Sequence, residues 1–411
     1  MKILHTADWH IGLKASRLGG AGARVRSERL RSARRVIDIA NERGADLVLL
    51  AGDTFDDNNV GASAVKEVAA ILETSAAPVC VIPGNHDYLC PGSVWDFDGW
   101  GRSGKIHLLT DETPFEIGGA VIYPCPLREY ESMASPTAWI PEERPRDGKI
   151  RIALAHGSVE GLPKEELDIP IPRDLPQRKN LDYAALGHWH SYSLYENGGA
   201  CRMAYSGSHE TTRFGKPDSF CAAAVTIDGA GAVPVIERLN IGALTWIDRE
   251  EKIDGGDALR AVAESILAIE NQESALVRLR LSGVYAIDDI GALDDLRAIG
   301  ESGRFLFFET LTDELSLVRG DIAADTGWIN NIGEILVRKT GERIAGMLAD
   351  FGRADTSSFF QSLDKTGKLL DKNIVKPTGQ SDLFGEIDNP DRAVSERALL
   401  ELYMICEGAR R

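Results

Sequence analysis

The chain has 411 residues, of which 43% are hydrophobic and 27% charged, and its formal net charge at pH 7 is −17. This length exceeds what one compact core accommodates and predicts two or three domains, and the composition is ordinary for a soluble globular protein. The negative charge argues against a protein that coats nucleic acid non-specifically, because such binding depends on neutralising phosphates. It does not exclude an enzyme with a local cationic track and bound divalent ions.

Targeting and redox signals favour a cytoplasmic protein. No apolar run reaches the roughly 18 residues of a membrane span, so we expect no membrane association. The segment Met1–His5 enters a predicted strand at once, so we expect no signal peptide. The six cysteines are scattered without CxxC spacing, which favours reduced thiols over a disulfide framework or a zinc finger.

The first part of the chain alternates between strands and helices. Apolar runs predict strands over residues 1–8, 46–51 and 78–82. Apolar residues at helical spacing predict helices over residues 27–43 and 63–73, and residues 11–26 are expected to form a loop. This βαβ alternation predicts an α/β domain.

Short strands dominate the next part of the chain. They are expected over residues 106–109, 120–123, 150–155, 183–186, 202–205, 221–227 and 234–239. Two loops, at 126–148 and 160–180, show neither helical nor alternating periodicity and are long enough to be functional. The predicted fold class of residues 1–244 is therefore α/β (α+β), a two-sheet β-sandwich flanked by helices.

Two further regions are expected after this domain. The pattern over residues 245–320 predicts a small α+β domain with three strands and two helices. Residues 321–411 predict a helical region with amphipathic helices over 328–351 and 392–406 and a flexible segment at 376–390. The apolar stripes of these helices would pack either on the chain's own domains or on a partner protein.

Polar side chains with metal-ligand chemistry follow the predicted strands. Asn85, His86 and Asp87 come directly after the strand over 78–82. Matching groups stand at four other strand ends, namely Asp8 with His10, Asp53, His156, and His188 with His190. The first and third residues of an extended tip point the same way, so both can reach one ion. The mixture of carboxylate, amide and imidazole without thiolate suits manganese, iron or zinc better than calcium or copper.

Two ions held in this way indicate a phosphoesterase. Paired cations about 3.5–4 Å apart stabilise both the attacking and the leaving oxygen of a phosphoryl displacement. Asp53 has two oxygens with which to bridge the ions. His86 is left over, to stabilise the pentacoordinate phosphorus or to protonate the leaving oxygen. Asp87 is expected to orient His86 through a hydrogen bond.

The motif order D-x-H, GD, GNHD, H and GHxH resembles that of the calcineurin-like metallophosphoesterase superfamily. Segments 5–12, 51–56, 83–87 and 183–190 are also similar to motifs of the bacterial SbcD-type DNA-repair exonucleases. The resemblance implies one ion held by Asp8, His10, Asp53 and His190, and another held by Asp53, Asn85, His156 and His188. It implies Mn²⁺ as the working metal, with Mg²⁺, Fe²⁺ or Zn²⁺ as alternatives.

The same resemblance implies a 3′→5′ exonuclease with some endonuclease activity on single strands, which processes DNA ends in double-strand-break repair. The implied partners are an SbcC-like ABC-type ATPase, on which residues 321–411 would dock, and a second copy of the chain. Residues 245–320 would form a capping domain that positions DNA. In one departure, archaeal and eukaryotic relatives carry a histidine three residues after the bridging aspartate, where this chain has Asp56. We expect Asp56 to contact His86 or solvent and leave it out of the predicted catalytic set.

Further segments are candidates for contacts with DNA or with a partner. A dense basic stretch contains Arg24, Arg26, Arg29, Arg31, Arg34 and Arg35, of which Arg24, Arg26, Arg31 and Arg35 are candidate phosphate contacts. The alternative is that these arginines are solvated on a helix face and partly neutralised by Glu28. His209, which follows a Gly-Ser turn, is another candidate phosphate contact. Gln380–Phe384 resembles the peptide with which bacterial replication proteins bind the sliding clamp, unless Leu383 and Phe384 fold onto the protein's own surface.

Two alternatives to a DNA nuclease remain open. An enzyme that acts on a small phosphodiester or phosphomonoester would use the same ions, because fold and metal site do not choose a substrate. A scaffold that binds DNA ends without cleaving them would need neither the complete ligand set nor His86. The presence of both argues against the scaffold.

Overall fold

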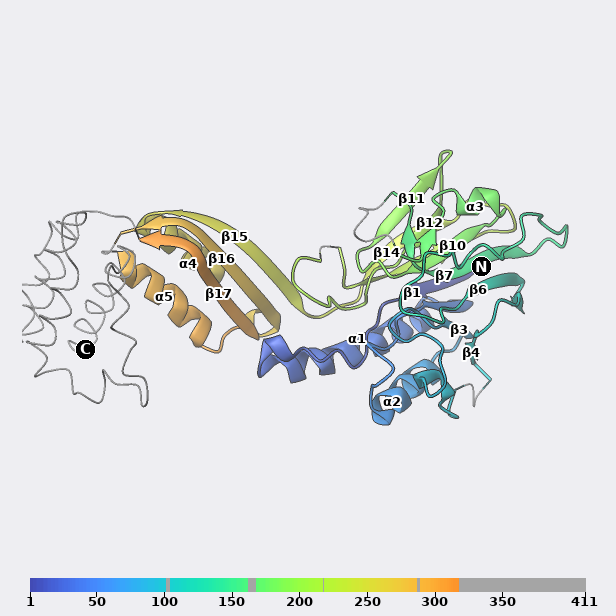
Figure 1. The fold of residues 1–411 in the computed structure, drawn as a ribbon, viewed down its shortest axis with the longest axis horizontal. Helices are drawn as coiled ribbons and strands as arrows, with labels where there is room; N and C mark the ends of the chain where they lie inside the picture. Colours follow the sequence, from blue (N-terminus) through green and yellow to red (C-terminus); the bar gives the residue numbers. More distant parts are fainter. Residues whose placement is uncertain (101–103, 162–167, 217, 287–288, 318–411) are drawn as a thin grey trace, which may run out of the picture. The chain divides into compact units, whose positions relative to one another are not determined.

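The computed structural model describes residues 1–100, 104–161, 168–216, 218–286 and 289–317. Within these ranges the chain forms two six-stranded sheets, a three-stranded sheet and a two-stranded pair, with helices between them (Figure 1). The predicted two-sheet sandwich flanked by helices is therefore confirmed. The predicted region 321–411, with its two helices, the flexible segment 376–390 and Gln380–Phe384, lies outside the described residues.

The first sheet has the strand order β14-β13-β1-β2-β3-β4. Its strands are β1 Lys2–Thr6, β2 Leu47–Ala51, β3 Val79–Ile82, β4 Ile106–Leu108, β13 Cys221–Thr226 and β14 Val235–Asn240. Strands β1 to β4 are parallel, and β13 pairs antiparallel with β1 and β14. Helices α1 (Ala21–Glu42) and α2 (Ala62–Glu73) pack on one face of this sheet (Figure 1).

The second sheet has the order β11-β12-β10-β7-β6-β5. Its strands are β5 Phe115–Ile117, β6 Ala120–Cys125, β7 Ile150–His156, β10 Tyr183–Gly187, β11 Ser193–Asn197 and β12 Ala200–Tyr205. Its four inner strands are parallel, and β5 and β11 are antiparallel edges. Both edge strands are missing from the sequence prediction, because β5 is short and β11 is largely exposed and lacks an apolar run.

The predicted loop at 160–180 contains more structure than expected. Strand β9 (Pro170–Ile171) pairs with β8 (Ser158–Val159), and α3 spans Leu175–Arg178. Elements of two and four residues are too short to produce a periodic pattern in the sequence. No strand or helix lies within 126–148, in agreement with the other predicted loop.

Successive apolar residues of the strands point to opposite faces of their sheet, and they form three clusters of buried hydrophobic side chains. In β2, Leu47, Leu49 and Ala51 face the second sheet, while Val48 and Leu50 face the helices. Strand β7 does the same: Ile152 and Leu154 face the first sheet, and its alanines face a third cluster beneath α3. Because both faces are covered, these strands read as continuous apolar runs.

Helix α1 begins at Ala21, six residues before the predicted start, so the predicted loop at 11–26 is too long. Its first two turns contain Gly22, Arg24 and Arg26, but Ala21 and Val25 are buried together with Leu18 of a short 3-10 turn, η1 (Ser16–Leu18). This narrow apolar stripe is enough to extend the helix. Further 3-10 turns are η2 (Val94–Asp96) and η4 (Gln272–Ser274).

The region from residue 245 to residue 317 contains three strands and two helices, the kinds of element predicted for residues 245–320. They are β15 Thr245–Asp254, α4 Gly256–Leu267, β16 Ala275–Tyr285, α5 Ile290–Glu301 and β17 Phe307–Leu317. The sheet order is β15-β16-β17. The domain boundary at residue 244 and the capping role stay predictions. Among the helices in the described part of the chain, none combines the length and the apolar character needed to cross a bilayer.

Candidate metal centre

The candidate ligands follow the carboxyl ends of parallel strands from both six-stranded sheets. Asp8 and His10 follow β1, Asp53 follows β2, and Asn85 and His86 follow β3. From the other sheet, His156 ends β7, and His188 and His190 follow β10. Polar groups gather there because parallel strands end at a common edge, where the loops take no part in the hydrogen bonding between strands. The structure brings all seven predicted ligands together, although their role as ligands stays a prediction.

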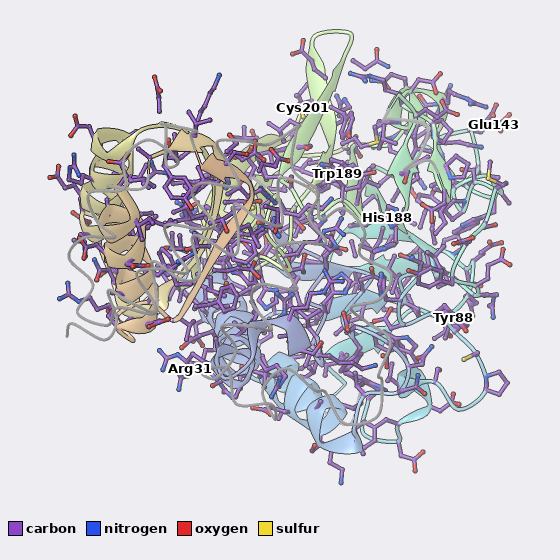
Figure 2. The ribbon with its side chains drawn as sticks, turned by 60° about the vertical axis from the view of Figure 1, so that its left-hand side comes forward. Arg31, Tyr88, Glu143, His188, Trp189 and Cys201 are labelled. Atoms are coloured by element: carbon purple, nitrogen blue, oxygen red, sulfur yellow. The ribbon has the colours of Figure 1, made fainter. Side chains whose placement is uncertain are left out.

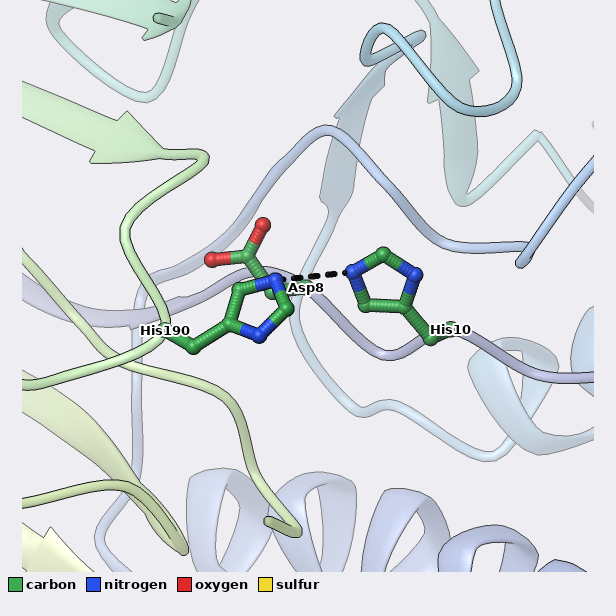
Figure 3. Close-up of side chains that lie close together, drawn as sticks. All are labelled: Asp8, His10 and His190. Carbon is green, nitrogen blue, oxygen red and sulfur yellow. Dashed lines mark hydrogen bonds between the residues drawn. The ribbon is translucent and has the colours of Figure 1, made fainter. Parts of the chain in front are cut away.

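Three overlapping groups of side chains bring possible ligand atoms within 4.8 Å of one another. They are Asp8 with His10 and His190, His10 with Asp53 and His86, and Asp8 with Asp53 and His156. Figure 3 shows the imidazoles of His10 and His190 turned toward each other, with the Asp8 carboxylate beside them. Their Nε2 atoms lie 3.0 Å apart. Asp8, His10 and Asp53 each belong to two of the groups, and Asp53 suits a bridging position because its Oδ2 lies near both His10 and His156.

The backbone at this edge is held in an uncommon conformation. The φ angles of Asp8, His10 and Asp53 are 55°, 42° and 51°, and that of His188 is 102°. Left-handed φ values at non-glycine residues cost free energy and persist where surrounding structure enforces them, often at functional sites. Here the conformation directs each ligand toward the shared centre.

Two glycines make room for His156. A β-carbon at Gly52 would lie 2.4 Å from its Nδ1, and Gly52 has a φ of 83°. A β-carbon at Gly187 would lie 2.7 Å from the same nitrogen. Only glycine permits so close an approach, and this explains why glycine precedes both Asp53 and His188.

One oxygen of Asp53 is fixed and the other faces the centre. Its Oδ1 accepts a hydrogen bond of 2.9 Å from the backbone amide of His86. Its Oδ2 lies 3.3 Å from Nε2 of His156 and 3.6 Å from Nε2 of His10. Asp8 is arranged in the same way: Oδ1 accepts from the amide of His188 at 2.9 Å, and Oδ2 is buried without a hydrogen-bond partner among the described residues.

Outward-facing contacts fix the ring nitrogens of the four histidines. Nδ1 of His156 lies 2.8 Å from the carbonyl oxygen of Ala51, so it carries a proton and donates it. Nε2 of His188 lies 3.0 Å from Oδ1 of Asp168. Nδ1 of His10 lies 3.3 Å from Oδ1 of Asp56. Nδ1 of His190 lies 2.9 Å from Oγ1 of Thr212.

These contacts test whether the site fits a cation. With its Nδ1 proton donated to Ala51, a neutral His156 presents a bare Nε2 to Asn85 Oδ1 at 3.0 Å and to Asp53 Oδ2. Asn85 Oδ1 also lies 3.1 Å from Nδ1 of His188. Acceptor atoms that face one another in a buried site are costly unless something positive lies between them. Together with the unpartnered Asp8 oxygen, the donor set fits a divalent cation.

The electrostatics of the site give the same result. Burial alone would lower the pKa of His156, but the carboxylates of Asp53 and Asp8 raise it to about 9. Burial raises the pKa of Asp8, whereas His156 and His10 outweigh burial at Asp53 and hold its pKa well below its ordinary value. The carboxylates thus favour a positive charge at the centre, and a proton on His156 occupies the place that a metal would take in exchange.

The sequence prediction missed the residues that orient the ligands. Asp168 lies in a loop without a pattern, and Thr212 follows no recognisable motif. Asp56 stands out in the sequence only as a departure from relatives, yet its carboxylate contacts His10, and its carbonyl oxygen lies 2.9 Å from Nδ1 of His86. Hydrogen-bonding groups behind a ligand set its tautomer and orientation.

The prediction that the Asp87 carboxylate accepts a hydrogen bond from the His86 ring is wrong. Asp87 is buried, and its two oxygens accept from the backbone amides of Gly84 at 2.7 Å and Phe55 at 3.0 Å. Burial and the neighbouring Asp53 raise its pKa to about 7. Asp87 therefore ties the Gly84–Asp87 turn to the segment after β2, and Asp56 takes over the orientation of His86.

His209 is also misplaced by the sequence prediction as a phosphate contact. Its side chain is fully buried, its Nε2 lies 2.8 Å from the carbonyl oxygen of Arg29, and its ring centroid lies 5.4 Å from that of Trp9. The glycine turn before it directs the chain inward rather than toward solvent. His209 is a core residue behind the site.

Arg29 points inward, unlike its neighbours in the basic stretch. It is 1% exposed, and its guanidinium donates to the carbonyl oxygens of Trp9, Glu210 and Thr211. Burial lowers the pKa of Arg29 to about 10, so it stays charged at neutral pH. Its contacts join the segment that carries His10 to the segment that carries Thr212.

The other arginines of this stretch lie on the exposed side of α1. Glu28 accepts from Arg24 and Arg31, each at 2.7 Å, so part of their charge is neutralised as expected. Arg26 donates to the carbonyl oxygen of Lys14, and Arg35 is exposed. Arg31 lies well apart from His188 and Trp189 in Figure 2. A phosphate track along α1 stays a prediction.

Comparison with known proteins assigns this site to a class. Residues 1–192 match the family model of the calcineurin-like phosphoesterases. These residues include all the candidate ligands, and they form a calcineurin-like metallophosphoesterase domain. The family is one of metal-dependent phosphoester hydrolases.

Several curated proteins are similar to the chain. An "Uncharacterized metallophosphoesterase YhaO" of Bacillus subtilis is 28% identical over 204 residues, which cover 46% of this chain and 48% of that protein. A "DNA double-strand break repair protein Mre11" of Sulfurisphaera tokodaii is 28% identical over 257 residues, covering 58% and 62%. A "Probable cyclic nucleotide phosphodiesterase" of Fibrobacter succinogenes is 26% identical over 161 residues, covering 36% and 58%. The matches therefore span between about half and two thirds of these relatives.

Proposed function

We propose that the chain is a two-metal phosphodiesterase that cleaves DNA. The observation that carries this proposal is the buried centre in which the inward atoms of His10, His156 and His190 meet those of Asp8, Asp53 and Asn85. When bound, two divalent cations would neutralise the phosphate oxygens and make hydroxide available near neutral pH. The donor set suits Mn²⁺, which is the metal we propose.

His86 is the candidate proton donor in this reaction. Its Nδ1 contact with the Asp56 carbonyl fixes the ring, so that Nε2 is the atom able to exchange a proton with a substrate oxygen. In hydrolysis, oxygen from water bonds to phosphorus as the bond to the leaving sugar oxygen breaks. A proton from His86 would then neutralise the leaving oxygen. Asp53 accepts a hydrogen bond from the His86 backbone amide, so the carboxylate that would bridge the ions also positions the proton donor.

Similarity to a DNA double-strand break repair protein supports DNA as the substrate. On this basis we propose 3′→5′ exonuclease and single-strand endonuclease activity at DNA ends. We also propose partnership with an SbcC-like ATPase and a second copy of the chain. Residues 245–320 would help to position the DNA.

The test is cleavage of 5′- and 3′-labelled linear duplex and single-stranded DNA by the purified chain. Manganese, magnesium and a chelator are compared, with bis-p-nitrophenyl phosphate as a small substrate. Manganese-dependent release of nucleotides from one end is the expected result, and the labelled end gives the polarity. Absence of hydrolysis of every ester with every metal would overturn the proposal.

A small phosphodiester is the second candidate substrate. Similarity to the cyclic nucleotide phosphodiesterase of Fibrobacter favours it. Hydrolysis of the small ester beside intact DNA would support this candidate, unless DNA cleavage returns when an SbcC-like subunit is added. That addition separates a missing partner from a different substrate.

A further inference from the structure

An exposed tyrosine lies against the candidate catalytic histidine. Tyr130 belongs to the loop at 126–148, and its ring centroid lies 5.3 Å from that of His86 with an angle of 67° between the rings. The edge-to-face contact uses only part of the ring, because the residue remains 49% exposed. A large aromatic surface is thus open to solvent directly beside the reacting centre.

Hydrogen bonds on both sides hold this tyrosine in place. On one side, the amide of Leu89 donates to Leu127 O at 2.9 Å, and the amide of Leu127 donates to Pro83 O at 3.3 Å. On the other side, the amide of Ile169, next to Asp168, donates to Ser132 O at 2.6 Å. We call residues 127–132 the tyrosine strap. It joins the segments that carry His86 and Asp168, so Tyr130 is positioned before any substrate arrives.

The charges around the Tyr130 ring determine which part of a substrate can lie on it. Glu129 and Glu131 flank Tyr130 and are exposed. Partial burial, followed by the carboxylates of Asp53 and Glu131, raises the pKa of the Tyr130 phenol, so the hydroxyl stays neutral. A phosphate would be repelled by the two glutamates, whereas an uncharged aromatic group would not.

Cationic charge stands on a different part of the site. The ammonium of Lys216 lies 4.8 Å from the centroid of the Trp189 ring, and Trp189 stands between His188 and His190 in the chain. The centre therefore has an aromatic, acidic wall at His86 and a cationic contribution beside the GHxH segment. A substrate with alternating phosphates and bases would place a base, not a phosphate, on the tyrosine strap.

We propose that Tyr130 is a stacking platform for the nucleobase next to the scissile phosphate. This inference rests on the proposed function and deepens it, since it makes nucleotide esters the preferred substrate class. Every base has a π-face, so the platform would tolerate any base sequence. Stacking of one base on an aromatic side chain changes affinity by about 5- to 150-fold.

Short substrates with and without each base test the platform. Dithymidine monophosphate is compared with two analogues in which tetrahydrofuran replaces the sugar and base on one side or the other, so that the charge is unchanged. The parent protein with manganese, Tyr130→Phe, Tyr130→Leu and Met133→Ala are assayed on each, with bis-p-nitrophenyl phosphate as the reference. Met133 is a matched control because it is 80% exposed in the same loop.

In the parent, removal of one of the two bases should lower kcat/KM about 5- to 150-fold. Tyr130→Leu should abolish that difference, while Tyr130→Phe and Met133→Ala should retain it. An equal loss on all three substrates in Tyr130→Leu would overturn the platform, because it would mean that Tyr130 only supports His86. Cleavage of the reference ester without any dinucleotide would overturn the platform alone. Inactivity on every substrate would overturn the proposed function as well.

Discussion

Charged side chains are arranged in opposite ways at the candidate metal centre and on the three-stranded sheet. On β15 and β16, Asp248 accepts hydrogen bonds from Arg278 at 2.6 Å and 3.0 Å and from Arg280 at 2.8 Å. At the metal centre, Asp8 and Asp53 are nearly fully buried, and no arginine or lysine of the described residues forms an ion pair with either. The carboxylate on the three-stranded sheet has cationic partners within the chain, whereas the carboxylates of the metal centre have no arginine or lysine partner among the described residues.

The difference separates stability from function. A carboxylate already paired with two guanidinium groups is satisfied in the folded chain and contributes a modest amount to its stability. Buried carboxylates and imidazoles without a counter-cation cost free energy until a cation binds. The fold retains this cost where the strand ends of the two six-stranded sheets meet, which makes that place the functional candidate.

The largest expected effect is that of His86→Ala. Loss of the proton donor should lower kcat by about 10²- to 10⁴-fold. Because the inward atoms of the other ligands are unchanged, two metal ions per chain should still bind, as measured by elemental analysis. His86 also approaches His10 and Asp53 within ligand distance, so loss of an ion in this variant would assign it to the metal instead.

The second-largest expected effect is stabilisation of the folded chain by metal binding at the candidate centre. Mn²⁺ at about 100 times its Kd should stabilise the fold by about 2.7 kcal/mol and raise Tm by about 5–10 °C. A thermal melt with and without the metal measures this shift. In Asp53→Asn, which removes a carboxylate near both His10 and His156, the shift should be much smaller; an unchanged shift would place the binding elsewhere.

Asp168→Asn should weaken the metal without removing a ligand. Asp168 fixes His188 from outside the centre, and partners of this kind change metal affinity by about 10- to 100-fold. Calorimetric titration with Mn²⁺ gives the affinity. The matched control is Asp174→Asn, an exposed carboxylate paired with Arg178, which should leave the affinity unchanged.

The smallest expected effect concerns Asp248 and its arginine partners on the three-stranded sheet. The hydrogen bond from Arg278 holds the pKa of Asp248 below its ordinary value. This carboxylate therefore contributes stability above its unfolded pKa, and the contribution is lost as pH falls through the lowered folded pKa. Asp248→Asn should destabilise the fold by about 1 kcal/mol or less at pH 7.

Denaturant unfolding of Asp248→Asn and the parent at pH 7 and near pH 3 measures this contribution. The difference between them should shrink at the lower pH. Glu250→Gln, on the same strand and 78% exposed, is the control with a smaller effect. A gap that is constant with pH would show that the variant acts through packing rather than charge.

The sequence by itself determined the sandwich and the candidate ligands. Strands such as β2 and β7, covered on both faces, appear as apolar runs, and a polar residue directly after such a run can only stand at the strand end. Asp53 and His156 follow from that rule. Local periodicity and chain order are enough for this kind of prediction.

Only the tertiary structure decided which groups face one another across the chain. Asp168 orients His188, Arg29 turns inward to hold carbonyl oxygens, and His209 is buried, although nothing in the neighbouring sequence distinguishes these residues. For the same reason, Asp56 and not Asp87 contacts the ring of His86. A hydrogen bond depends on the positions of two distant segments to within a fraction of an ångström, and local sequence patterns carry no such information.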